Sequence, residues 1–137
     1  MWKVYALLSA FFAALTAILA KIGVKDIDSN LATAVRTTVI IVITWGIVAF
    51  SGTVQGLRTV NNTSLIFLIL SGCATGASWL FYFKALQIGD ASKVAPVDKL
   101  SVALTIFLSI LILREPADPK TIIGGLLIVA GTLVIIL

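Results

Sequence analysis

The sequence predicts an all-α integral membrane protein with five transmembrane helices, and three observations support this fold class. Hydrophobic residues make up 60% of the 137 residues, charged residues only 12%, and the mean hydropathy is +1.15. A soluble domain of this size could not cover so much apolar surface. The apolar residues fall into runs of about 20, the length that a helix needs to cross a hydrocarbon core of ~30 Å.

Taken in order along the chain, the apolar runs and the polar segments between them predict a single domain over residues 1–137. The expected spans are residues 4–22, 31–50, 64–86, 91–113 and 121–137. Asp28 or Ser29 is placed to cap the second span. Gly89 is expected to end the third span, and Asp90 to cap the fourth. Pro116 and Pro119 delimit the loop before the last span.

The composition excludes several classes of function. The chain contains no histidine, and its single cysteine, Cys73, lies in an apolar run, so we expect no metal site, no intrachain disulfide and no cofactor. The net charge of +4 comes from scattered basic residues without a clustered stripe, which argues against nucleic acid as a partner. No nucleophile–base arrangement or phosphate loop is present, so we expect no enzyme.

Lysine and arginine near the span ends are evenly divided between the two sides of the membrane. One side carries Lys3, Arg58, Arg114 and Lys120, and the other carries Lys21, Lys25, Lys84 and Lys93. Because an excess of these residues sets orientation, two interpretations stay open. Either a single orientation follows from a weak bias, or copies insert both ways and pair as an antiparallel twofold homodimer.

Small residues mark faces on which membrane helices can approach closely. The candidates for helix packing are Gly72, Gly76, Gly124 and Gly131, with Gly125 beside the last pair. They serve either packing within one five-helix bundle or a dimer seam.

Four ionisable residues lie inside the spans: Arg36, Lys84, Asp98 and Lys99. Such groups are costly in lipid and usually face a cavity or one another, so they are candidates for substrate or ion binding. Asp98 and Lys99 are adjacent and should point about 100° apart on a continuous helix, without facing each other. Pro96 should loosen the first turns of this span, because it cannot donate to the carbonyl of Ser92.

Asp98 begins a polar line that continues through Ser101, Thr105 and Ser109, which predicts that it faces the interior of the bundle. One interpretation is a structural ion pair of Asp98 with Arg36 or Lys84. The other starts from the excess of positive charge in the spans and predicts an anionic or zwitterionic small-molecule ligand, or a lipid phosphate.

The four aromatic residues among positions 79–83 either line a pocket or form an interfacial belt. Trp79 and Tyr82 are the better pocket candidates because each can donate a hydrogen bond, and Phe81 and Phe83 fit the belt.

Four segments together resemble the EamA domain of the drug/metabolite transporter superfamily. They are LFYFKALQIG at residues 80–89, DASKVAP at 90–96, LREP at 113–116 and IGGLLIVAGT at 123–132. Most relatives carry two such domains as an inverted repeat of ten helices, and this chain is similar to the half-size, five-helix bacterial and archaeal branch. By position, Glu115 and Lys84 match the acidic residue after the fourth helix and the basic or polar residue after the aromatic run. The Asp98–Lys99 pair departs from the family pattern.

The resemblance implies a secondary transporter in the plasma membrane of a prokaryote, moving a small metabolite by alternating access between two inverted copies. In this interpretation Asp98, Lys84 and Arg36 surround the central cavity, and Asp98 is the natural proton carrier if transport is proton-coupled. The alternative function is a non-transporting membrane subunit or scaffold, whose intramembrane charges dock a partner helix.

Overall fold

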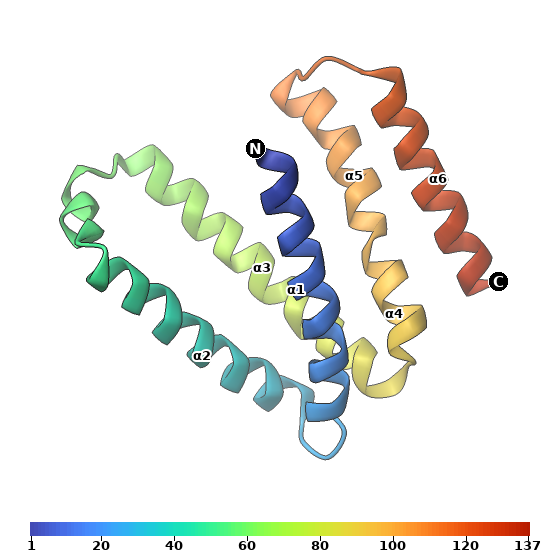
Figure 1. Ribbon diagram of the computed structural model, residues 1–137, viewed down its shortest axis with the longest axis horizontal. Coiled ribbons are helices and arrows are strands. Elements are labelled where there is room, and N and C mark those ends of the chain that lie inside the picture. The colour runs from blue at the N-terminus through green and yellow to red at the C-terminus, as the bar shows by residue number, and fades with distance from the viewer. The chain divides into compact units, whose positions relative to one another are not determined.

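The computed structural model describes residues 1–137, and all of its regular structure is helical. The helices are α1 (Trp2–Gly23), α2 (Ser29–Phe50), the 3₁₀ helix η1 (Thr53–Thr59), α3 (Asn62–Ile88), α4 (Ala91–Asp98), α5 (Leu100–Leu108), the π-helical turn η2 (Ser109–Leu113) and α6 (Pro119–Ile136) (Figure 1). Five segments are long and apolar enough to cross a membrane: α1, α2, α3, α6 and the stretch Ala91–Leu113. The predicted fold class is therefore confirmed, and the main departure is that the fourth span consists of three helical pieces.

Acidic and amide side chains begin three of these helices. Oδ1 of Asp28 accepts hydrogen bonds from the backbone N–H groups of Asn30 (2.8 Å) and Leu31 (3.2 Å). Asn61 and Asp118 serve α3 and α6 in the same way, through the N–H groups of Ser64 and Thr121. These contacts satisfy donors that have no partner within the helix, and they select Asp28 from the two predicted caps of α2.

Asp90 occupies the N-cap position of α4, as predicted, but its side chain forms no capping hydrogen bond. Its carbonyl oxygen instead accepts from the N–H groups of Lys93 (3.0 Å) and Val94 (2.9 Å). The carboxylate of Asp90 is thus not required to start the helix.

The chain forms two compact units, and α1 contributes to both. The first, residues 18–87, is called the α2–α3 unit below. The second, residues 1–17 with 88–137, is called the α4–α6 unit.

The α2–α3 unit has a small core where the end of α1, the start of α2 and the end of α3 meet. Its buried side chains are Val24, Ser29, Ala32, Thr33, Phe83 and Leu86. Nζ of Lys21 donates to the carbonyl of Leu86 at 2.7 Å, and Nε2 of Gln87 donates to the carbonyl of Ile27 at 2.9 Å. A lysine at the last carbonyls of a helix also complements the helix dipole, so these two bonds secure the end of α3.

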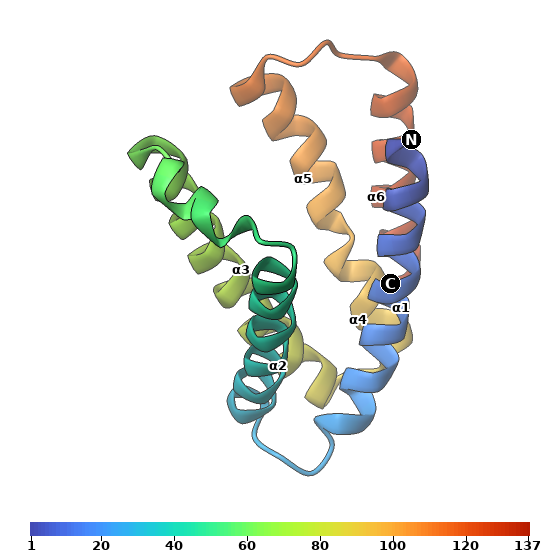
Figure 2. The same ribbon diagram turned by 60° about the vertical axis from the view of Figure 1, so that its left-hand side comes forward.

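In the α4–α6 unit, α6 lies beside α5 and contacts α4 as well (Figures 1 and 2). Thr132 of α6 is buried, and its hydroxyl lies 3.3 Å from the carbonyl of Pro96 and 2.8 Å from that of Ile128. Gly125 is also buried, and a Cβ at this position would lie 3.0 Å from Cδ1 of Ile106. A glycine at 125 therefore allows the close approach of α5 and α6.

The four glycines predicted to pack helices differ from Gly125 in their surroundings. A Cβ at Gly72, Gly76, Gly124 or Gly131 would meet no atom within 4 Å. Their role in helix packing stays a prediction. The close helix contact that the structure shows is at Gly125, next to Gly124.

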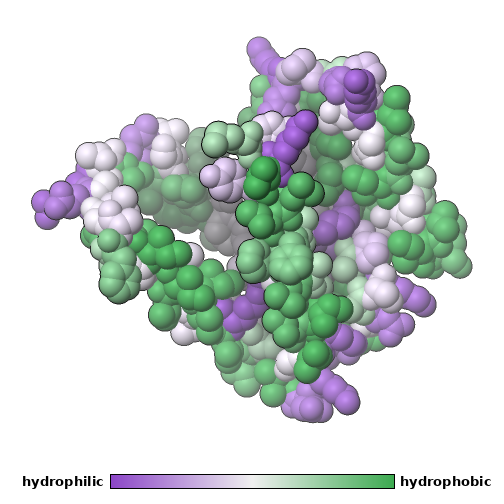
Figure 3. Space-filling model, viewed as in Figure 1, coloured by the Kyte–Doolittle hydropathy of each residue, from purple (hydrophilic) through white to green (hydrophobic).

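Large apolar side chains point outward from helices of both units. Phe67, Phe107 and Leu127 are 67%, 62% and 67% exposed, and Figure 3 shows apolar residues covering most of the visible face, with hydrophilic residues concentrated near helix ends and loops. Such a surface is stable against lipid or another protein surface, because contiguous apolar patches on soluble monomers are much smaller. It fits an integral membrane protein.

Candidate functional site

The fourth span is interrupted where the sequence predicted a loosened turn. α4 ends at Asp98, α5 begins at Leu100, and Pro96 lies inside α4. The N–H of Lys99 donates to the carbonyl of Pro96 at 3.0 Å, and that of Val102 to the carbonyl of Lys99 at 3.0 Å, so the chain forms i→i+3 bonds here. Pro96 lacks the N–H donor and its ring crowds the turn before it, so it weakens α4 about one turn before the break.

Asp98 and Lys99 form an ion pair across this break. Nζ of Lys99 lies 3.4 Å from Oδ2 of Asp98, and the side chains are 54% (Lys99) and 36% (Asp98) exposed. The expectation that the two side chains do not face each other was wrong. It assumed a continuous helix, whereas Lys99 lies between two helices with ψ at −8°, and its long side chain folds back to the preceding carboxylate.

Two of the three hydroxyl groups that follow Asp98 in the polar line donate to backbone carbonyls one turn earlier. Oγ1 of Thr105 donates to the carbonyl of Ser101 at 2.8 Å, and Oγ of Ser109 donates to that of Ile106 at 3.0 Å. Ser101 and Thr105 are exposed and Ser109 is half-buried. Because the hydroxyl hydrogens of Thr105 and Ser109 already have partners, these oxygens offer hydrogen-bond acceptors; their place in a substrate path stays a prediction.

In the α2–α3 unit, Arg36 lies against two aromatic rings of α3. Its Cζ atom is 4.2 Å from the centroid of the Trp79 ring and 5.4 Å from that of Phe83. Arg36 is the eighth residue of α2, roughly 10 Å along the axis from the start of the helix at 1.5 Å per residue. An arginine at the centre of a span costs at least about 2.5 kcal/mol, and each ring contributes about 0.5–2 kcal/mol. The rings therefore stabilise Arg36 in the membrane without neutralising its charge.

The aromatic residues divide differently from the belt-and-pocket expectation. Phe83, assigned to the belt, is only 3% exposed and packs beneath Arg36. Trp79 is partly buried and contacts the same guanidinium. The Tyr82 ring meets that of Phe83 edge to face, with centroids 6.4 Å apart. The contact of Phe83 with Arg36 of α2 depends on how two helices lie together, which the position of a residue on α3 alone does not reveal.

Lys84 is held by a neutral group. Its Nζ atom donates to Oε1 of Gln87 at 3.1 Å, and the same amide donates to the carbonyl of Ile27. Lys84 thus joins the hydrogen bonds that secure the end of α3. Asp98 belongs to the α4–α6 unit and Arg36 and Lys84 to the α2–α3 unit, so a cavity shared by the three residues stays a prediction.

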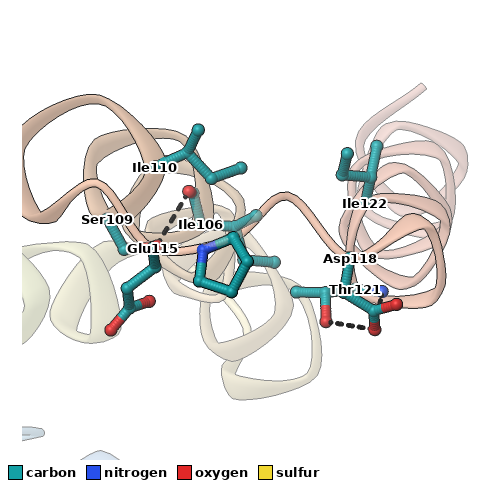
Figure 4. A pocket seen from close by; sticks show the side chains of 8 residues that line it. Ile106, Ser109, Ile110, Glu115, Asp118, Thr121 and Ile122 are labelled. Carbon is teal, nitrogen blue, oxygen red and sulfur yellow. Dashed lines mark hydrogen bonds between the residues drawn. The ribbon is translucent and has the colours of Figure 1, made fainter.

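A hollow of about 360 Å³ lies beside the loop between η2 and α6 (Figure 4). Glu115 and Asp118 line it together with Ser109 and Thr121, and Asp118 also accepts a hydrogen bond from the Thr121 hydroxyl at 3.1 Å. Arg114 ends the π-helical turn with a φ of +55°, and its N–H and that of Glu115 both donate to the carbonyl of Ser109. Glu115, which by position matches the acidic residue after the fourth helix of the family, thus lies at this hollow.

A second hollow, of about 290 Å³, lies where α2 meets η1, and its lining includes Thr44, Trp45 and Leu57. Neither Arg36 nor Asp98 lines either of these two hollows. Neither hollow could be predicted from the sequence, nor could the role of Thr132 or the Gly125–Ile106 contact, because these depend on which helices lie side by side.

The fold and the site define an integral membrane protein with polar groups inside its spans. One of its five spans is interrupted at an ion pair, and another carries an arginine stacked on aromatic rings. Discontinuous helices of this kind are typical of transporters. The EamA-like transporter family matches residues 1–137, and the chain belongs to this family. It is 47% identical over 134 residues to an uncharacterized transporter in the cobO 3′ region of a Sinorhizobium species, an alignment that covers 98% of this chain and 95% of that relative. No solved structure matches the chain.

No group of three or more His, Cys, Asp or Glu side chains that could hold a metal ion is present among residues 1–137. The polar interactions observed within the spans are ion pairing, hydrogen bonding and cation–π contact. These interactions suit binding and release of a small molecule.

Proposed function

We propose that the protein is a secondary transporter of a small metabolite, working by alternating access as an antiparallel homodimer in the plasma membrane of a prokaryote. Membership of the EamA-like family and the transporter-named relative support transport itself. Neither of them names a substrate. The even division of lysine and arginine between the two sides supports a dimer of inverted copies.

The observation that carries the proposal is the half-exposed ion pair inside a span. Asp98 is the eighth residue of the apolar stretch Ala91–Leu113, roughly 10 Å along the helix axis from its start. An ion pair facing hydrocarbon at this depth would cost several kcal/mol. We therefore expect the pair to face a water-filled path, another part of the protein or a second copy, and the first and the last of these arrangements suit a transport site.

Protonation of Asp98 would remove the negative charge and release Lys99, because the two side chains are 3.4 Å apart. This gives a simple coupling between a proton and a change of contacts at the helix break. Asp98 is thus the proposed carrier of a coupling proton.

The test is flux through the purified protein in liposomes, recorded as charge movement on a supported membrane while carboxylates, organic phosphates and amines are offered in turn. We expect a proton-dependent current with at least one class and its loss in Asp98→Asn. Asp90→Asn is the matched control, because Asp90 lies at a helix start and its carboxylate caps nothing. Unchanged transport in Asp98→Asn rejects the role of Asp98.

Absence of flux with every class, together with stable co-purification of another membrane protein, would instead support the alternative of a non-transporting subunit. In that case the intramembrane charges would contact a partner helix.

A further inference from the structure

The α2–α3 unit places positive charge within its helices without placing a carboxylate there. Its basic residues within α1, α2 and α3 are Lys21, Arg36 and Lys84, and its two acidic residues, Asp26 and Asp28, lie in the loop between α1 and α2. Asp28 is already used as the helix cap of α2. The unit therefore lacks an internal counter-charge for its in-span cations.

Two of these three cations have a structural use. Lys21 donates to a terminal carbonyl of α3, and Lys84 donates to Gln87, whose amide reaches the loop before α2. Both lie within the last turns of their helices. The third, Arg36, lies further inside its helix, and the contacts of its guanidinium are with the ring faces of Trp79 and Phe83.

The contact with Trp79 and Phe83 leaves the guanidinium free to bind a ligand. A ring face attracts the cation but accepts none of the strong hydrogen bonds that the five N–H donors can form. The side chain is only partly buried, and no fully buried side-chain nitrogen or oxygen lacks a hydrogen-bond partner. The donors of Arg36 are thus within reach of a ligand from outside the unit.

We infer that Arg36 binds the oxyanion of the transported molecule, a carboxylate or a phosphate, while Trp79 and Phe83 position its guanidinium. The planar fork of an arginine matches such groups in a bidentate manner, and an anion supplies the charge that the unit lacks. This inference rests on the proposed transport function and adds the substrate class to it. A lipid phosphate offers the same chemistry, so the test separates the two sources.

The test uses Trp79 as a reporter of binding. In a Trp2→Phe, Trp45→Phe background Trp79 is the one remaining tryptophan, and its emission is recorded in an uncharged maltoside detergent. The probes are inorganic phosphate, acetate, dihexanoyl phosphatidylglycerol as the lipid phosphate, and tetramethylammonium as a cation. We expect a saturable change with phosphate or acetate and none with tetramethylammonium.

Substitutions assign the change to Arg36. Arg36→Gln should weaken binding at least about tenfold, as expected for loss of a charged hydrogen bond, and Arg36→Lys should give an intermediate loss because it keeps the charge but not the fork. Arg58→Gln is the matched control, since Arg58 lies in η1 outside the spans. Helix content by circular dichroism checks that each variant is folded.

The inference is overturned if no free oxyanion changes the emission, if only the lipid probe does, or if Arg36→Gln binds as the parent does. Its failure is separable from that of transport. Proton-dependent flux without oxyanion binding would reject the inference alone. Oxyanion binding at Arg36 without flux would reject the transport function and leave Arg36 as an oxyanion site of another use.

Discussion

The contact between Gly125 and Ile106 allows a quantitative test of how α5 and α6 pack. A Cβ at position 125 would lie 3.0 Å from Cδ1 of Ile106, shorter than the 3.4–4 Å of ordinary contacts, whereas a Cβ at Gly124 meets nothing within 4 Å. Ala replacing Gly gains about 1 kcal/mol of helix propensity at either site, so the difference between Gly125→Ala and Gly124→Ala isolates the clash. Overpacking costs about 1–3 kcal/mol, and we expect the lower end because the obstructing atom is a terminal methyl.

The free energy of unfolding is measured by titrating the purified protein with SDS and following far-UV circular dichroism. Gly125→Ala should be less stable than Gly124→Ala by about 1 kcal/mol. Ile106→Val removes the Cδ1 atom, so combining it with Gly125→Ala should restore most of that loss, which appears as a coupling energy in a double-mutant cycle. Equal stabilities for the two alanine variants, or no coupling to Ile106→Val, would refute the observed register of α5 against α6.

Three further predictions use the same unfolding assay. Pro96→Ala restores an N–H donor in α4 and should raise the free energy of unfolding by up to about 3 kcal/mol. Pro119→Ala, at the first position of α6, should change it little. A larger gain at Pro119 would show that Pro96 does not weaken α4. Thr132→Val removes the hydroxyl that lies 3.3 Å from the carbonyl of Pro96 and should cost about 0.6 kcal/mol, the average for a hydrogen bond between membrane helices; a stabilising effect would show that this bond contributes nothing. Arg114→Gly relieves a left-handed φ of +55° and should raise the free energy of unfolding by up to about 1 kcal/mol, whereas Arg114→Ala keeps the strain. Equal effects of the two substitutions would argue against a strained residue at this turn.

Features that depend on local sequence could be predicted well. Apolar runs of about 20 residues predict the spans because the bilayer sets a fixed length. Asp28 and the helix break after Pro96 follow from hydrogen-bond donors and acceptors within one turn. In each case the responsible groups lie a few residues apart.

Features that depend on neighbouring helices could not be predicted in this way. Arg36 is 43 positions from Trp79 and 47 from Phe83 in sequence, and no periodicity indicates that they meet. The choice of Gly125 over Gly124 depends on the rotation of α6 against Ile106. The Asp98–Lys99 pair differs from the prediction for a local reason. The 100° separation of adjacent side chains holds only in a continuous helix, and the helix is interrupted at Lys99.

The proposal that two inverted copies form the transport path is tested most directly by the orientation of the C-terminus. Green fluorescent protein, which is fluorescent when it remains in the cytoplasm, and alkaline phosphatase, which is active only outside it, are each fused after Leu137 in otherwise identical bacterial cells. The proposed mechanism predicts a strong signal from both fusions, because copies insert in both orientations. A signal from one fusion alone would contradict the antiparallel homodimer.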